Sequence, residues 1–99
     1  MIKLLMSWDI RSGKEAEYME FITQEFAPGM LKMGLQPTEA WYTVAGNGPQ
    51  ILAGSVTDDR ETMQRILKSE DWEALEKKLL AYVTSYKYKI VPATGHFQL

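Results

Sequence analysis

The sequence contains no cysteine in its 99 residues and only one histidine, His96. Disulfide bonds and thiolate metal sites are therefore excluded, and the absence of cysteine fits a reducing compartment. A structural zinc site takes four ligands from cysteine, histidine and carboxylate side chains. Because the chain has no second histidine and no carboxylate cluster with metal-ligand spacing, we expect no bound metal.

The chain also lacks an excess of basic residues and any long apolar run. Its net charge is −2, so nucleic acid is not an expected partner. No stretch approaches the ~18 apolar residues that cross a membrane, and the apolar segment 1–6 is too short for a signal peptide. No glycine-rich loop precedes a helix pattern to bind a dinucleotide phosphate. We therefore expect a soluble, cytoplasmic protein without a cofactor.

The strongest pattern present is a β-hairpin over residues 36–57. Two runs rich in β-branched and aromatic residues flank the sequence Gly46-Asn47-Gly48-Pro49. Glycine and asparagine tolerate the positive φ angles that a tight reversal needs, and a proline cannot continue a strand ladder. This stretch predicts two antiparallel strands joined by a turn at these four residues.

A strand pattern and a helix pattern precede the hairpin. Alternating side chains predict a strand over residues 2–10, and Asp9 near its end is expected to cap the following turn. Apolar residues at steps of three and four predict a helix from Lys14 to about Met33, with Met19 on its inward face. Pro28 lies inside this pattern and predicts either a kink or a second, short helix that starts at Ala27.

A second helical region and a last strand follow the hairpin. The helical region is predicted to open at Asp58 and to end at Thr84-Ser85. Within it, Ser69 is a hydroxyl cap ahead of Trp72, which predicts a new helix start there. The last strand is predicted over residues 86–91.

The resulting order is β-α-β-β-α-β, which we assign to the α+β class as a single domain over residues 1–99. Right-handed crossovers then give a four-stranded antiparallel sheet in the order 4-1-3-2, with both helices on one face. Both faces of this sheet carry apolar side chains, including Leu4 on one side and Leu5 on the other. A monomer would expose one of these faces, so we expect a homodimer that pairs sheet against sheet.

The order of elements, Gly13-Lys14 before the first helix and the Ser69-x-x-Trp72 helix start resemble the dimeric α/β-barrel superfamily. That superfamily includes antibiotic-biosynthesis monooxygenase-like and NIPSNAP-like domains. The resemblance implies a ferredoxin-like protomer, a face-to-face dimer and a small-molecule cleft between the sheet and the helices. It also implies that Leu4, Met6 and Trp8 face the helices, whereas Leu5 lies in the dimer interface.

Some members of the superfamily oxidise aromatic substrates without metal or flavin, and this implies an apolar cleft with one or two polar groups. The alternative is that the aromatic side chains of this protein form only the core and the dimer interface, and that the protein is a non-catalytic interaction module. His96 could act as a general base only with a partner in such a cleft, and the alternative is that it is a solvated or interface histidine. The candidate cleft residues are Met6, Trp8, Trp41, Tyr42, Trp72 and His96.

Other members of the superfamily degrade haem with a helix histidine as the iron ligand. Aligning the Ser69-x-x-Trp72 motif with that of the haem-degrading members places Glu76 at the position of their ligand histidine. The same alignment places Ile66 near the position of their tryptophan. The first strand offers Met6 or Ser7 in place of an asparagine. All three positions depart from the haem pattern, so haem degradation is set aside.

Overall fold

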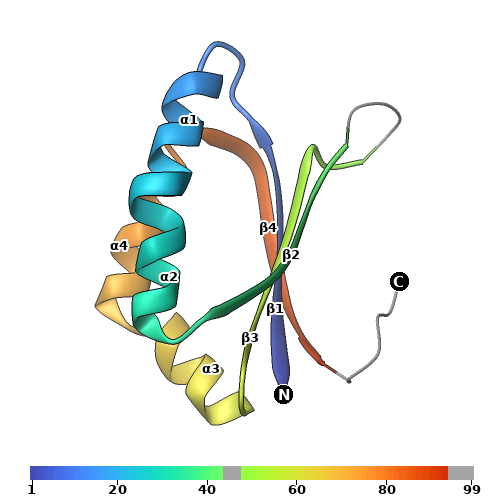
Figure 1. The fold of residues 1–99 in the computed structure, drawn as a ribbon, viewed down its shortest axis with the longest axis vertical. Helices are drawn as coiled ribbons and strands as arrows, with labels where there is room; N and C mark the ends of the chain where they lie inside the picture. Colours follow the sequence, from blue (N-terminus) through green and yellow to red (C-terminus); the bar gives the residue numbers. More distant parts are fainter. Residues whose placement is uncertain (44–47, 94–99) are drawn as a thin grey trace.

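The computed structural model describes residues 1–43 and 48–93 as a four-stranded antiparallel sheet with helices on one face (Figure 1). The strand order is β2-β3-β1-β4, which confirms the predicted topology. In the predicted hairpin turn, Gly46 and Asn47 lie outside the described residues. The strands are β1 (Ile2–Ile10), β2 (Gln36–Tyr42), β3 (Ile51–Thr57) and β4 (Val83–Pro92).

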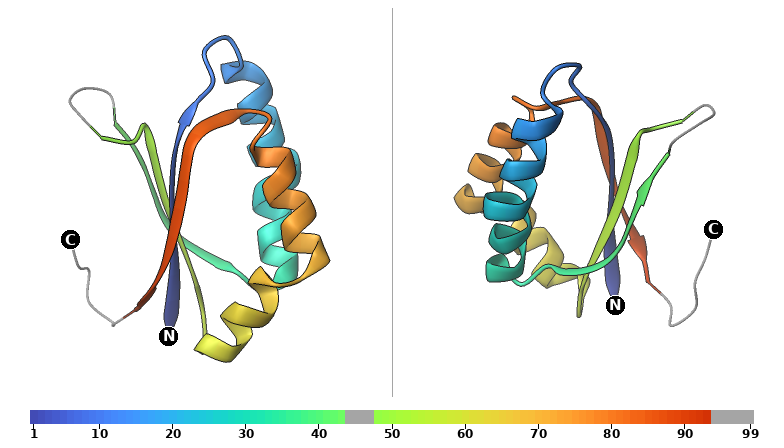
Figure 2. Two further views of the ribbon diagram at one scale, coloured as in Figure 1. Left: turned by 180° about the vertical axis from the view of Figure 1, so that it is seen from behind. Right: turned by 45° about the horizontal axis from the view of Figure 1, so that its top comes forward.

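In the described part of the chain, four α-helices and one π-helix cover a single face of the sheet, and the opposite face carries no helix (Figures 1 and 2). Within the described residues no helix is both long and apolar enough to span a membrane. The helices are α1 (Glu15–Phe21), π-helix η1 (Ile22–Phe26), α2 (Ala27–Met33), α3 (Arg60–Leu67) and α4 (Glu70–Leu79).

The alternation of β1 decides which face of the sheet becomes the core. Leu4, Met6 and Trp8 are 0, 1 and 2% exposed and belong to the core beneath the helices. The side chains between them, including Leu5, point to the opposite face, because successive residues of a strand alternate. The implied orientation of the first strand is therefore confirmed.

Pro28 lies in the first turn of α2, which starts at Ala27 and confirms the predicted second start, and a π-helical turn connects it to α1. The Ala27 N–H donates to the carbonyl of Ile22, five residues back, which closes the wider turn of a π-helix. This wider turn also changes which side chains face inward. Met19, predicted to be inward, is 54% exposed, whereas Phe21 and Phe26, five residues apart, are both 4% exposed.

Two hydrogen-bonded caps start the later helices. Asp59 caps α3 by accepting from the Thr62 N–H, one residue after the predicted Asp58. Ser69 caps α4 by accepting from the Trp72 N–H, as predicted. The predicted end of this helix at residues 84–85 is wrong, because α4 stops at Leu79 and β4 begins at Val83.

Asp9 joins the end of β1 to the hairpin instead of capping its own turn. The Gln50 N–H donates to Asp9 Oδ1 (2.8 Å), and the Ile10 N–H donates to Gln50 Oε1 (2.8 Å). The Gln50 side-chain amide also donates to the Tyr42 hydroxyl (3.1 Å). The two hydrogen bonds that link Asp9 and Ile10 to Gln50 extend the connection between β1 and β3 beyond the last ladder pair, Trp8 and Ile51.

We expect Asp9→Ala to lower the free energy of unfolding by about 1–2 kcal/mol, because the half-buried Gln50 N–H loses its acceptor. Chemical denaturation measures this loss, and hydrogen exchange should be faster at the Gln50 amide. Glu61→Ala, on the exposed side of α3, is the control and should change stability by less than about 0.5 kcal/mol. An Asp9→Ala protein as stable as wild type would contradict a structural role for this link.

Candidate functional site

A small cavity of about 150 Å³ lies between the first helical region and the part of the sheet formed by β1, β3 and β2. Its walls come from both layers, so it occupies the position implied for a ligand cleft. Most of its lining is apolar. The lining includes the side chains of Met6, Trp8, Tyr18, Phe26, Ala53 and Ser55.

The π-helix shapes the wall that faces the sheet. Ile22, Phe26 and Ala27 all line the cavity, and they come from η1 and the residue that follows it. The Phe26 ring meets the Trp8 ring edge to face, with centroids 6.0 Å apart and planes at 84°. Short π-helical segments occur frequently at functional sites. Here the segment turns Phe26 towards the sheet beside the cavity.

Tyr18 supplies the first polar group of the cavity wall. Its hydroxyl oxygen accepts a hydrogen bond from the Trp8 indole N–H (3.0 Å), and both side chains are almost fully buried. Burial raises the pKa of the Tyr18 phenol above its ordinary value, and the hydrogen bond from Trp8 opposes this rise in part. Tyr18 therefore stays protonated at neutral pH, so its hydroxyl retains a proton that it can donate and does not act as a base.

Ser55 supplies the second polar group, and its hydroxyl has no partner. The residue is 1% exposed, and Ser55 Oγ is the one buried side-chain polar atom without a hydrogen bond in the described part of the chain. Its Cα is paired with that of Leu4, which faces the helices, so the Ser55 side chain also lies on the cavity side. A buried hydroxyl without a partner costs about 1–3 kcal/mol.

Glu39 belongs to the lining, but its carboxylate is engaged on the opposite face of the sheet. Lys3 Nζ lies 2.7 Å from Glu39 Oε1, and this ion pair crosses over β3 at Gly54. A Cβ at Gly54 would lie 2.6 Å from the same carboxylate oxygen, so a larger residue there would displace the Glu39 side chain from this position. Hydrogen bonds from Lys3, and then from Thr38, lower the pKa of Glu39. The carboxylate is thus ionised and paired away from the cavity.

The structure brings together only part of the predicted cleft. Met6 and Trp8 line the cavity. Trp72 is 2% exposed and packs behind the cavity against Phe26, with ring centroids 6.3 Å apart. Trp41, 52% exposed, pairs with Leu52, whose neighbour in β1 is Ser7 on the face without helices.

The remaining two predicted cleft residues do not line the cavity walls described here. Tyr42 is 58% exposed, and its hydroxyl accepts from the Gln50 side chain near the end of β2. His96 lies outside the described residues. Ligand binding by any member of the predicted set stays a prediction.

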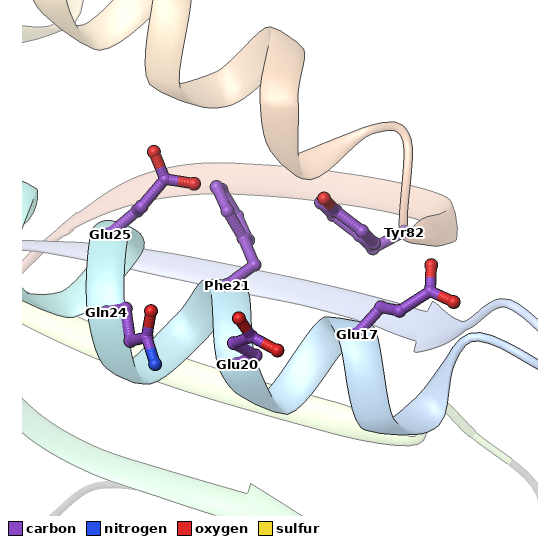
Figure 3. A pocket seen from close by; sticks show the side chains of 6 residues that line it. All are labelled: Glu17, Glu20, Phe21, Gln24, Glu25 and Tyr82. Atoms are coloured by element: carbon purple, nitrogen blue, oxygen red, sulfur yellow. The ribbon is translucent and has the colours of Figure 1, made fainter.

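A second, larger hollow of about 260 Å³ lies on the outer surface of the first helical region (Figure 3). Its floor is the stacked pair Phe21 and Tyr82, with centroids 5.0 Å apart, and Figure 3 shows Glu17 and Glu25 on either side of it. Glu25 already pairs with Lys78 (3.1 Å) across the helices. This solvated acidic hollow has no buried polar group aimed into it, so the cavity under η1 is the stronger candidate.

Glu76, placed by alignment at a haem-ligand position, is held inside the fold by a tyrosine. The Tyr86 hydroxyl donates to Glu76 Oε2 (2.7 Å), and burial together with this bond raises the pKa of Tyr86. Within residues 1–43 and 48–93, no three histidine, cysteine, aspartate or glutamate side chains gather in a way that could hold a metal ion. The expectation that no metal is required stays a prediction.

The two polar groups of the cavity, Tyr18 and Ser55, are not among the residues predicted from the sequence. A regular helical period does not predict Tyr18 on the inward face, because η1 shifts that face. Ser55 could have been found by alternation, because it stands two residues beyond Ala53 on the same side of β3. A serine on an otherwise apolar strand face is the signal that the sequence offers.

No protein-family model matches this sequence, and no curated protein matches it. Solved structures do share its fold. A NIPSNAP-domain protein from Burkholderia xenovorans superposes with a TM-score of 0.71 over 99% of each chain, at 14% identity. A protein from Arabidopsis thaliana gives a TM-score of 0.79 over 99% of this chain and 100% of its own, at 11% identity.

A third structure is a candidate antibiotic biosynthesis monooxygenase from Nitrosomonas europaea. It covers 94% of this chain and 98% of its own, with a TM-score of 0.66 at 8% identity. At such low identities these likenesses establish the fold and no activity. The chain has the ferredoxin-like α+β fold of NIPSNAP-domain and antibiotic biosynthesis monooxygenase-like proteins, as the sequence resemblance implied.

Proposed function

We propose that this protein binds a small apolar molecule in the cavity between the sheet and η1. The observation that carries the proposal is the buried Ser55 hydroxyl, which has no hydrogen-bond partner among the described residues and faces a largely apolar space. Ligand sites typically combine apolar walls with a few placed polar groups. At about 150 Å³ the space suits one ring or a short chain, and a polycyclic substrate would need the walls to move.

The lining favours binding over catalysis. A substrate that reacts with oxygen after deprotonation needs a base close to the proton that is removed. Among the described lining residues, Tyr18 is kept protonated by its raised pKa and the Glu39 carboxylate pairs with Lys3 on the other face. Neither group is placed to act as that base. An oxygenase of the antibiotic-biosynthesis type is therefore the second candidate, supported by the shared fold alone.

We also propose that the binding protein is a homodimer through the face of the sheet without helices. Trp41 and Leu52 are 52 and 38% exposed on this face, and the Lys3–Glu39 pair neutralises two of its charges. A second copy would cover these apolar side chains with the same surface of its own, on a face that also carries the exposed Lys87 and Lys89 of β4. We place the protein in the cytoplasm because a chain without cysteine fits a reducing compartment.

A substitution that fills the cavity should show whether the protein is a small-molecule binding protein or a non-catalytic interaction module. We expect single-ring compounds such as toluene to raise the melting temperature of the wild type, because a ligand of the native state stabilises it by mass action. Ala53→Leu places three more carbon atoms against the cavity and should abolish that shift. The variant itself should melt at or above the wild-type temperature, since filling a void generally stabilises a protein.

Ala74→Leu is the matched control, because Ala74 is exposed on α4 and far from the lining residues. It should keep the full ligand-induced shift. Equal shifts in wild type and Ala53→Leu would place binding elsewhere. No shift with any small apolar compound would favour the non-catalytic interaction module.

A further inference from the structure

Ser55 indicates that the ligand of the cavity carries a hydrogen-bonding group. A serine hydroxyl can donate one hydrogen bond and accept others, and Ser55 Oγ makes none within the described residues. Water is a poor partner at this place, because buried waters typically make about three hydrogen bonds and most of the lining is apolar. A molecule with an apolar body and one polar atom would satisfy both the hydroxyl and the walls.

The charges around the cavity indicate that this group is neutral. The described lining contains no lysine, arginine or histidine, so a bound carboxylate or phosphate would lack a counter-ion. The one acidic residue of the lining, Glu39, has its carboxylate 2.7 Å from Lys3 Nζ on the opposite face, so a cation finds no free partner either. Burying an unpaired charge is much more costly than burying a neutral hydroxyl or carbonyl.

The size of the cavity limits the apolar body. A void of about 150 Å³ is of the order that accommodates benzene in an apolar protein interior. The aromatic rings of Trp8 and Phe26 lie against it, and aromatic walls favour a flat ring in edge-to-face or offset contact. Several fused rings would extend beyond a space of this volume.

We propose that the ligand is a neutral single-ring alcohol, phenol or ketone whose oxygen pairs with Ser55 Oγ. This inference rests on the proposed binding function and adds the chemical class of the ligand. Tyr18, whose hydroxyl oxygen already accepts from Trp8, forms part of the wall. Ser55 is the group that distinguishes an oxygenated ring from a hydrocarbon of the same shape.

The test compares phenol with toluene, which have nearly the same shape but differ in a hydroxyl against a methyl group. Dissociation constants are measured by calorimetry for wild type, Ser55→Ala and Ser55→Thr. We expect Ser55→Ala to weaken phenol binding about 5- to 20-fold and to leave toluene binding within about twofold, since a neutral hydrogen bond contributes roughly 1–1.5 kcal/mol. Ser55→Thr keeps a hydroxyl and should keep the preference for phenol.

Ser7→Ala is the matched control, because Ser7 lies in β1 on the opposite face of the sheet. It should alter neither constant. Equal weakening of phenol and toluene by Ser55→Ala, or no weakening of phenol, would overturn the assignment of Ser55 while toluene binding still supports a cavity binder. A wild type that binds neither compound would overturn the proposed function and this inference together.

Discussion

Trp72→Ala should lower the free energy of unfolding by about 3–5 kcal/mol, which is the usual cost of removing a buried large aromatic side chain. Trp72 is 2% exposed, and its ring lies 6.3 Å from that of Phe26. It therefore joins α4 to the π-helical segment through the core. Its backbone N–H also closes the Ser69 cap, which the alanine variant retains, so the loss reports the side chain alone.

Urea denaturation of wild type and variant measures this loss. The control is Leu80→Ala, because Leu80 is 42% exposed just beyond the same helix and should cost less than about 1 kcal/mol. The deletion also removes one neighbour of Phe26, so a larger cavity and altered binding of single-ring compounds should accompany the loss. A Trp72→Ala protein within 1 kcal/mol of wild type would show that the helical layer is held to the sheet in another way.

The sequence was sufficient for the topology because local patterns and chain connectivity act together. Gly48-Pro49 and the flanking strand runs predict the hairpin, and right-handed crossovers leave one strand order. The Ser69 start was also readable, since a hydroxyl before Trp72 satisfies an N–H of the first turn. These features depend on neighbours in the sequence, which is why they could be predicted.

The features that were missed depend on departures from regular periods or on distant partners. The π-helical turn before Pro28 shifts the inward face, so Met19 points outward and Phe21 inward. Asp9 finds its partner in Gln50, which is 41 residues away along the chain. No local pattern encodes such a pairing.

The candidate site was predictable only where strand alternation determines it. Met6 and Trp8 were placed correctly beneath the helices because β1 is regular at these positions. Trp41 was assigned to the cleft on its aromatic character, yet its ladder pairing with Leu52 puts it on the other face. Strand alternation also places Ser55 on the cavity side, two residues beyond Ala53, but only the structure shows that its hydroxyl lacks a partner among the described residues.

Leu5→Glu, on the face of the sheet without helices, is expected to weaken the proposed dimer strongly. Leu5 is half-buried there, with Gly54 and Lys89 as its neighbours in the ladders. In the proposed dimer a carboxylate at this position would be enclosed between two sheets, which costs about 3 kcal/mol when the charge lacks full compensation. We therefore expect the dissociation constant of the dimer to rise about a hundredfold.

The same substitution should leave the isolated protomer folded, because without a second copy the half-buried position of Leu5 borders solvent and a carboxylate there stays hydrated. Analytical ultracentrifugation over a range of concentrations measures the dissociation constant, and circular dichroism checks the fold. Gln64→Glu introduces the same charge on the exposed side of α3 and should leave the dimer intact. A wild type that is monomeric at every concentration, or a Leu5→Glu protein that dimerises as tightly as wild type, would show that this face of the sheet is not the interface.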